Sequence, residues 1–322
     1  MLVFDLIAGL VIVGIVPGPA APRRRRPLTA AGGPSLGSAH VARPARPRSA
    51  PGPGSLTWEL LGDVRGLLMA PATLVLQVAH PVVGAGVAQH SRFRTDPWRR
   101  LTRTISSTVR FTYGTDAVAG PEAARLRHLH AGIAGTDDRG RPYRALDPAA
   151  YAWVHLTLAH FAVDVRRVLG RPLTPAQRAA FYAEWRRVGL RLGVADAEMP
   201  PDWPAFLDYF DAVLHTTLED NQSVRDVLDV VRRPPPPTRR IPDALWDPLA
   251  VRAGTLQTLF TVGTLPTPMR ERLALAWTDA DQRRLEQRAS VVRGLFSALP
   301  APLRTYPQVL PHVLEARFTS VG

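Results

Sequence analysis

Hydrophobic and polar positions of residues 55–322 recur with the period of an α-helix, and no sustained strand alternation is bounded by turn pairs. Two helix starts are strongly marked, because Asp147 stands before Pro148 and residues 174–177 (TPAQ) form a capping box. The pattern predicts helices over residues 56–79, 97–113, 121–135, 148–169, 175–192, 203–217, 221–232, 245–262, 267–276, 279–298 and 302–317. We expect the first helix to break or kink at Pro71. The sequence therefore predicts an all-α fold.

Residues 1–54 have a different character and predict a disordered, low-complexity leader. An apolar run over residues 2–16 is interrupted by Asp5 and is shorter than the roughly 20 residues that span a bilayer. Arginines 23–26 follow this run, whereas a secretory signal carries its positive charge first. Two readings stay open: a weak membrane anchor, or an artefact of an upstream start codon. A third reading, a cleaved secretion signal, is less favoured than either of these two.

We expect residues 55–322 to form a single helical domain. The polyproline run 234–237 then serves as a rigid break between helices of that domain. The 85 residues after the run are too few to form an obvious unit of their own.

Composition removes several classes of chemistry. The chain has no cysteine, so it has no disulfide framework, thiolate metal site or iron–sulfur cluster. All 40 basic residues are arginine, which excludes a Schiff-base lysine and a P-loop lysine. The leader carries +6 of the net charge of +13, and no basic stripe with interleaved aromatics follows it. We therefore expect no nucleic-acid partner.

The histidines are the informative candidates for chemistry. His155 lies in the middle of a strongly apolar helix, where an imidazole has to be hydrogen-bonded or coordinating. Two readings stay open: a core histidine satisfied by a backbone carbonyl, and a ligand. His128 and His130 are about 200° apart around a helix, and His155 and His160 about 140° apart, so neither pair predicts a multi-histidine cluster.

Sharper motifs are missing. The chain contains no His-Glu-x-x-His zinc motif, no Glu-x-x-His pair of di-iron bundles and no Gly-x-Ser-x-Gly nucleophile elbow. An all-α body with isolated histidines in apolar helices suits a haem pocket, which needs one axial imidazole in an apolar cavity. It suits a protein without a cofactor equally well.

Three groups of residues resemble the MpaB-type oxygenase family, which shares its catalytic domain with the rubber oxygenases (latex-clearing proteins). Its N-terminal signature is similar to residues 76–97, LQVAHPVVGAGVAQHSRFRTDP. Its second signature is similar to residues 125–131 (RLRHLHA), 140–148 (GRPYRALDP) and 153–155 (WVH). Its C-terminal one is similar to residues 261–266 (TVGTLP) and 270–272 (RER). The resemblance covers about residues 55–315 and leaves the leader outside.

The resemblance implies a globin-like, all-helical fold that holds haem b, with iron as its metal. It implies His155 as the proximal haem ligand and His130 as the distal candidate, at a place where the rubber enzymes use a lysine that this chain lacks. Arg127, one turn before His130, is the candidate to hydrogen-bond bound oxygen or a propionate, and the excess of arginine in the chain keeps a plain surface side chain as the alternative. Thr157 is expected to line the same pocket.

The function implied is oxidative attack by dioxygen on a carbon–carbon double bond of a hydrophobic substrate, and isoprenoids are the class that the resemblance suggests. The alternative is a haem-free helical binding protein for an apolar ligand. Nothing in the sequence identifies the electron donor. The leader suggests peripheral association with a membrane, so the expected location is cytoplasmic or membrane-associated.

Overall fold

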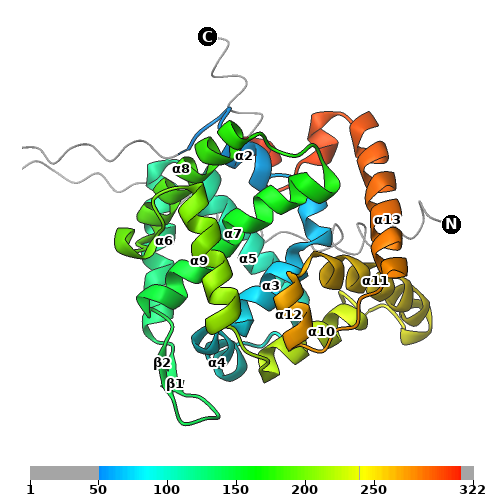
Figure 1. The fold of residues 1–322 in the computed structure, drawn as a ribbon, viewed down its shortest axis with the longest axis horizontal. Coiled ribbons are helices and arrows are strands. Elements are labelled where there is room, and N and C mark those ends of the chain that lie inside the picture. Colours follow the sequence, from blue (N-terminus) through cyan, green and yellow to red (C-terminus); the bar gives the residue numbers. More distant parts are fainter. Residues whose placement is uncertain (1–50, 239, 313–322) are drawn as a thin grey trace, which may run out of the picture.

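The computed structural model describes residues 51–238 and 240–312, and it is built almost entirely of helices (Figure 1). The predicted leader therefore lies outside the described residues, except for residues 51–54. Pro51 is buried, and its carbonyl accepts a hydrogen bond of 3.1 Å from the Trp58 indole. The all-α fold class is confirmed.

The first predicted helix, over residues 56–79, is divided into three shorter helices. They are α2 (Leu56–Leu61), the 3₁₀ helix η1 (Val64–Leu68) and α3 (Ala70–Ala79). The predicted break at Pro71 is confirmed, because η1 ends at Leu68 and α3 starts immediately before Pro71, which stands in its first turn, where its missing N–H costs nothing. A second, unpredicted break lies at Asp63, whose carboxylate caps η1 and pairs with the buried Arg65.

Helices α4 (Pro81–His90), α5 (Pro97–Tyr113) and α6 (Asp116–Ala131) follow. The bounds of α5 agree with the prediction. Helix α6 begins five residues before the predicted start, with Pro121 inside it, so the proline is not the helix start that the sequence suggested. Packing of α6 against α5 compensates for the hydrogen bond that Pro121 cannot donate.

A buried carboxylate joins α5 to α6. Glu122 accepts hydrogen bonds from Ser107 of α5, at 2.5 Å, and from the Arg125 guanidinium, at 2.9 Å. The hydrogen bond from Arg125 is the main reason why the pKa of Glu122 falls to about 2, against the opposing effect of burial. The carboxylate is therefore charged and paired at any physiological pH.

A short antiparallel hairpin, β1 (Ala134–Thr136) and β2 (Pro142–Arg144), is absent from the predicted elements. Its turn uses Gly140, whose φ of +78° favours glycine. Three residues in each strand are too few to produce a visible alternation. The hairpin projects from one end of the molecule (Figure 1) and delivers the chain directly to α7.

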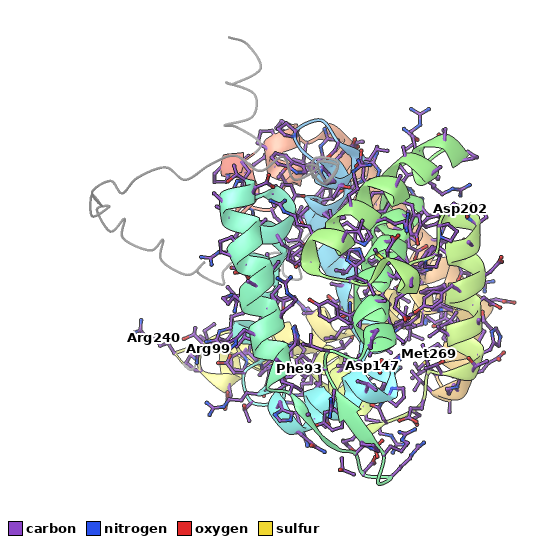
Figure 2. All side chains as sticks on the ribbon, turned by 90° about the vertical axis from the view of Figure 1, so that its left-hand side faces the viewer. Phe93, Arg99, Asp147, Asp202, Arg240 and Met269 are labelled. Atoms are coloured by element: carbon purple, nitrogen blue, oxygen red, sulfur yellow. The ribbon has the colours of Figure 1, made fainter. Side chains whose placement is uncertain are left out.

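Helix α7 (Pro148–Leu169) runs through the middle of the molecule and packs against α3, α8 and α13 (Figure 1). Both predicted caps are confirmed. The Asp147 side chain accepts from the Ala150 amide, at the end of α7 nearest the hairpin (Figure 2). Thr174 and Gln177 form the capping box of α8 (Pro175–Leu192).

The remaining elements complete the fold around α7. They are η2 (Asp196–Glu198), α9 (Trp203–Thr216), α10 (Gln222–Arg232), α11 (Asp243–Thr264), α12 (Thr267–Arg272), α13 (Asp279–Ala298) and η3 (Ala301–Arg304). The predicted helix 302–317 is wrong in its described part, where η3 is followed by a turn and helix resumes only at residue 310. Prolines at 300, 302 and 307 explain the interruption.

The core is divided by α7. One face of α7 contributes Trp153 and Leu156 to the large cluster shared with α3, α8, α9 and α10. Its C-terminal half contributes Val165 and Leu169 to a second cluster, made with α11 and α13. No single helix in the described ranges has the length and apolarity to cross a membrane, although α3 and α4 pass that test together while bent by 102°.

Helices α10 and α11 approach so closely that only glycine fits between them. A Cβ atom on Gly254 would lie 1.9 Å from the Arg232 carbonyl oxygen, which is backbone and cannot move aside alone. We expect Gly254→Ala to lower the free energy of unfolding by about 3 kcal/mol or more, because overpacking forces the two helices apart. Denaturant titration measures this.

The matched control is Gly294→Ala, in the interior of α13, where an added Cβ meets nothing within 4 Å. It should raise the free energy of unfolding by about 0.5–1 kcal/mol, since alanine is the better helix former. Equal effects of the two substitutions would contradict the close approach of α10 and α11.

Candidate functional site

His155 is held between α7 and α8 by a reciprocal pair of hydrogen bonds. Its Nε2 lies 3.0 Å from the Trp185 carbonyl oxygen, and the Trp185 indole donates to the His155 carbonyl at 3.0 Å. The two rings stack with centroids 4.6 Å apart and planes 5° apart. The imidazole is only 4% exposed. Position and orientation of the ring are thus fixed by a residue 30 positions away.

This pairing determines the protonation of His155. A carbonyl only accepts, so Nε2 carries the hydrogen and Nδ1 holds the lone pair. Nδ1 is buried and has no hydrogen-bond partner among the described residues. Burial lowers the pKa of His155 to about 4, against the opposing effect of the hydrogen bond to Trp185. The ring is therefore neutral at physiological pH and offers one unused nitrogen.

Gly189 of α8 makes room for the imidazole. A Cβ atom there would lie 2.7 Å from His155 Nε2 and 2.6 Å from the Met199 sulfur. Sequence reasoning did not single out Gly189 or Trp185. A lone glycine inside a helix is the signal that could have indicated a close approach at this point.

His130 and Arg127 lie on the same side of α7 as His155. The His130 ring meets Tyr151 edge to face, with centroids 5.8 Å apart, and Tyr151 is one turn before His155 on α7. Arg127 donates to the Leu192 carbonyl, 3.1 Å away, at the end of α8. Helices α6, α7 and α8 thus bring three of the four predicted site residues to one side of α7.

The fourth, Thr157, lies on another side of α7. Its hydroxyl donates to the Val154 carbonyl at 2.8 Å and accepts from Gln77 of α3 at 2.9 Å. Two residues along a helix turn the side chain by about 200°, so Thr157 faces α3 whereas His155 faces α8. The structure does not bring these two side chains together.

The His130 imidazole is half-buried, and its Nδ1 has no hydrogen-bond partner within the described ranges. Burial lowers the pKa of His130, and the positive charges of Arg100 and Arg125 lower it further, against the opposing effect of the Leu126 backbone. The side chain is therefore neutral near pH 7. It supplies a neutral imidazole on the side of α7 where His155 lies.

His80 is a further buried histidine, at the junction of α3 and α4. Burial lowers its pKa, while the charges of Asp147 and Glu219 act in the opposite direction. Within the described residues no three histidine or acidic side chains gather in a way that could hold a metal ion. Any metal at these histidines would need further ligands from outside the described residues.

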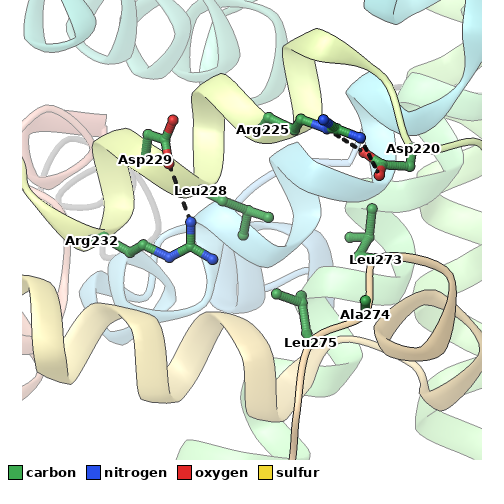
Figure 3. A pocket seen from close by; sticks show the side chains of 8 residues that line it. All are labelled: Asp220, Arg225, Leu228, Asp229, Arg232, Leu273, Ala274 and Leu275. Carbon is green, nitrogen blue, oxygen red and sulfur yellow. Dashed lines mark hydrogen bonds and ion pairs between the residues drawn. The ribbon is translucent and has the colours of Figure 1, made fainter.

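Two cavities lie elsewhere. The larger, about 390 Å³, lies between α10 and residues 273–275, with Leu228 at its centre and the ion pairs of Arg225 with Asp220 and Arg232 with Asp229 around it (Figure 3). The smaller, about 10 Å³, lies beside His160 and has the size of one water molecule. Neither cavity touches His155.

Comparison with known proteins agrees with the resemblance of residues 76–97 and 125–155. Residues 58–294 match the family described as ER-bound oxygenase mpaB/B'/rubber oxygenase, catalytic domain. An uncharacterized protein of Mycobacterium bovis is 29% identical over 241 residues, which are 73% of this chain and 90% of that protein. An uncharacterized protein of Mycobacterium tuberculosis is similar to the same extent. No solved structure matches the chain significantly.

The family match spans α2 to α13 and so includes both the His155 pairing with Trp185 and the His130 side of α7. The chain belongs to the family of the mpaB/B' and rubber oxygenase catalytic domains, and it is an oxidoreductase of the oxygenase type.

Proposed function

We propose that this protein is a haem b-dependent oxygenase that attacks a carbon–carbon double bond of a hydrophobic substrate with dioxygen. The observation that carries the proposal is the His155 imidazole, which is buried, neutral and left with one unpartnered nitrogen inside an oxygenase domain. The polar atoms of a buried structural histidine normally have hydrogen-bond partners in addition to the packing of the ring. A neutral ring nitrogen with a free lone pair is able to ligate a metal.

The neutral His155 imidazole is the type of donor that an axial haem site uses. Metal-ligating histidines almost always donate their other ring N–H to a carbonyl, carboxylate or water, which fixes the tautomer and raises ligand basicity. The Trp185 carbonyl accepts from Nε2 here, so the ring has to turn over and donate from Nδ1 before Nε2, the nitrogen remote from Cβ, is free for iron. Haem iron needs a single protein nitrogen, so a site without a cluster of three ligands is sufficient. Room for the macrocycle has to come from rearrangement of side chains around the ring.

Haem bound in this way supplies dioxygen chemistry at the iron. The residues of the chain position the group and exclude water. Trp185 fixes the His155 ring, and the apolar side chains of α7 and α8 favour an apolar substrate over water. His130 and Arg127 supply a neutral imidazole and a guanidinium on the same side of α7. An isoprenoid is the substrate class that the family resemblance suggests.

A haem-free binding protein for an apolar ligand is the second candidate. It rests on the backbone carbonyl that satisfies His155 Nε2 and on the space that only glycine leaves at position 189, which together allow a structural role for the imidazole without a metal. The two functions differ in one readily measured property, the absorption spectrum of the pure protein.

We expect the protein purified from haem-supplied cells to show a Soret band, and His155→Gln and His155→Ala to lose it. The reason is that removal of the only proposed axial nitrogen leaves the iron without a protein ligand. Absorption spectroscopy with quantification of haem per chain measures this.

His160→Ala is the matched control. His160 is on the same helix, but its ring stacks on Phe210, with ring centroids 4.3 Å apart, and so points away from the proposed site. It should keep the band. A colourless wild-type protein would refute the haem enzyme and leave the apolar binder. A His155→Gln variant with undiminished haem would refute ligation by His155 alone.

A second prediction follows from the neutral state of His155. Its pKa is 6.5 in the unfolded chain and about 4 in the haem-free folded protein, so between these values the unfolded state binds the proton more readily. The free energy of unfolding should therefore fall as the pH drops from 6.5 to 4, by up to about 3 kcal/mol from this residue.

Denaturant titrations of the haem-free protein across this pH range measure the effect. In His155→Gln the slope should become shallower by that amount, whereas His80, His130 and His160, whose pKa values are also lowered by burial, still contribute. Identical slopes in the two proteins would show that His155 is accessible to protons in the fold.

A further inference from the structure

The cavity beside α10 has the make-up of a small-molecule site. Its volume of about 390 Å³ lies within the range of roughly 300–1,000 Å³ that ligand pockets occupy. Leu228 of α10 lies at its centre, opposite Leu273 and Leu275 of the turn that follows α12 (Figure 3). Charged side chains stand at its two ends. The cavity therefore suits a molecule that is mostly apolar.

Ala274, in the wall of this cavity, has a strained backbone. Its φ of +50° lies in the left-handed region that favours glycine, and within the described ranges no other residue except glycine has a positive φ. The conformation ends α12, where the Ala274 amide donates to the Glu271 carbonyl and the Leu275 amide to the Arg270 carbonyl. The turn thus holds its leucines against the cavity at a cost in stability, and strain of this kind gathers at ligand sites.

The two ends of the cavity differ in how their arginines are paired. At one end, Arg225 binds the Asp220 carboxylate with two hydrogen bonds, of 3.2 Å from Nε and 2.9 Å from Nη2. At the other end, Arg232 makes a single side-chain contact among the described residues, of 3.2 Å from Nη1 to the exposed Asp229 carboxylate. A guanidinium carries five N–H donors. The Arg232 end therefore keeps donors for a further acceptor, whereas the Arg225 end is closed.

The Arg232 side chain is directed at the apolar part of the cavity. In Figure 3 it extends from α10 toward Leu228 and Leu275, while Asp229 stands on the side away from Leu275. Its backbone is fixed, because the Arg232 carbonyl oxygen lies 1.9 Å from the place where a Cβ on Gly254 of α11 would be. A fixed attachment point limits the positions that the guanidinium can reach. Such pre-organisation reduces the entropy that is lost on binding.

We propose that this cavity binds an amphipathic carboxylic acid, with its carboxylate on Arg232 and its apolar chain over the three leucines. Guanidinium and carboxylate form paired, charge-assisted hydrogen bonds, which are stronger than bonds between neutral groups. Arg225 and Arg232 are seven residues apart on α10, so the apolar part of the site is about 10 Å long. The inference does not rest on the proposed haem site, because the cavity does not touch His155.

Two other kinds of ligand fit less well. A cationic amphiphile would need Asp229, whose carboxylate stands away from Leu275 and already accepts from Arg232. A ligand with a negative charge at each end would meet the closed pair of Arg225 and Asp220. One carboxylate on an apolar chain matches the one end of the cavity that has unused donors.

Calorimetric titration of the full chain with decanoate tests the proposal. Decanoate should bind, whereas decanol and decyltrimethylammonium, which carry other head groups on a chain of the same length, should bind roughly tenfold more weakly or less. Arg232→Gln should weaken decanoate binding roughly tenfold or more, because the charge-assisted pair is lost. Arg284→Gln is the matched control, since Arg284 makes the same kind of single contact with Asp281, at 3.1 Å, on α13. It should leave the affinity unchanged.

The absence of cysteine from the chain allows a second measurement. N-phenylmaleimide attached to Ala274→Cys should abolish decanoate binding by filling the cavity, and the same group on Ser290→Cys, an exposed position of α13, should not. Thermal unfolding and titration of the unlabelled variants check that the fold and the affinity are retained. Absence of decanoate binding, equally tight binding of decanol, or undiminished binding to Arg232→Gln or to labelled Ala274→Cys would each overturn the proposal.

Discussion

The hydrogen bonds exchanged by His155 and Trp185 are the constraint on which the candidate site depends. Each side chain donates to the other residue's backbone carbonyl, so α7 and α8 are joined at one level by two bonds and a ring stack. A carbonyl acceptor on Nε2 leaves Nδ1 as the only nitrogen with a free lone pair. The same contact that stabilises the helix pair therefore leaves one nitrogen of the imidazole without a partner among the described residues.

Burial gives this pairing its chemical consequence. At the surface an imidazole exchanges protons near neutrality, but inside the cluster of α7 and α8 the charged form is disfavoured. The neighbouring His130 is held neutral by the same cause, with the arginines of α5 and α6 adding to it. Two neutral imidazoles beside apolar helices are compatible with an oxygenase domain, in which water has to be kept away from the reacting oxygen.

A second constraint operates at the other end of the fold, where backbone rather than side chains sets the geometry. Gly254 allows α11 to touch the last turn of α10, and the indoles of Trp98 and Trp246 donate to carbonyls of the polyproline loop that connects these helices. Together these contacts fix how α10 and α11 pack. The position of Arg232 beside the cavity is thus a result of tight packing on the opposite side of its backbone.

The sequence by itself determined the all-α class, the caps at Asp147 and Thr174 and the family, because caps and helical periodicity act within a few residues of the chain. It also indicated that His155 is buried. Because positions 155 and 157 are about 200° apart around a helix, the sequence already implied that the side chains of His155 and Thr157 face different sides. The tertiary structure alone decided that Trp185 and Gly189 meet His155, that the first helix breaks at Asp63, and that Arg232 lies beside the cavity of α10. Those outcomes depend on which helices pack together, and contacts between residues 30 or more positions apart leave no periodic trace in the sequence.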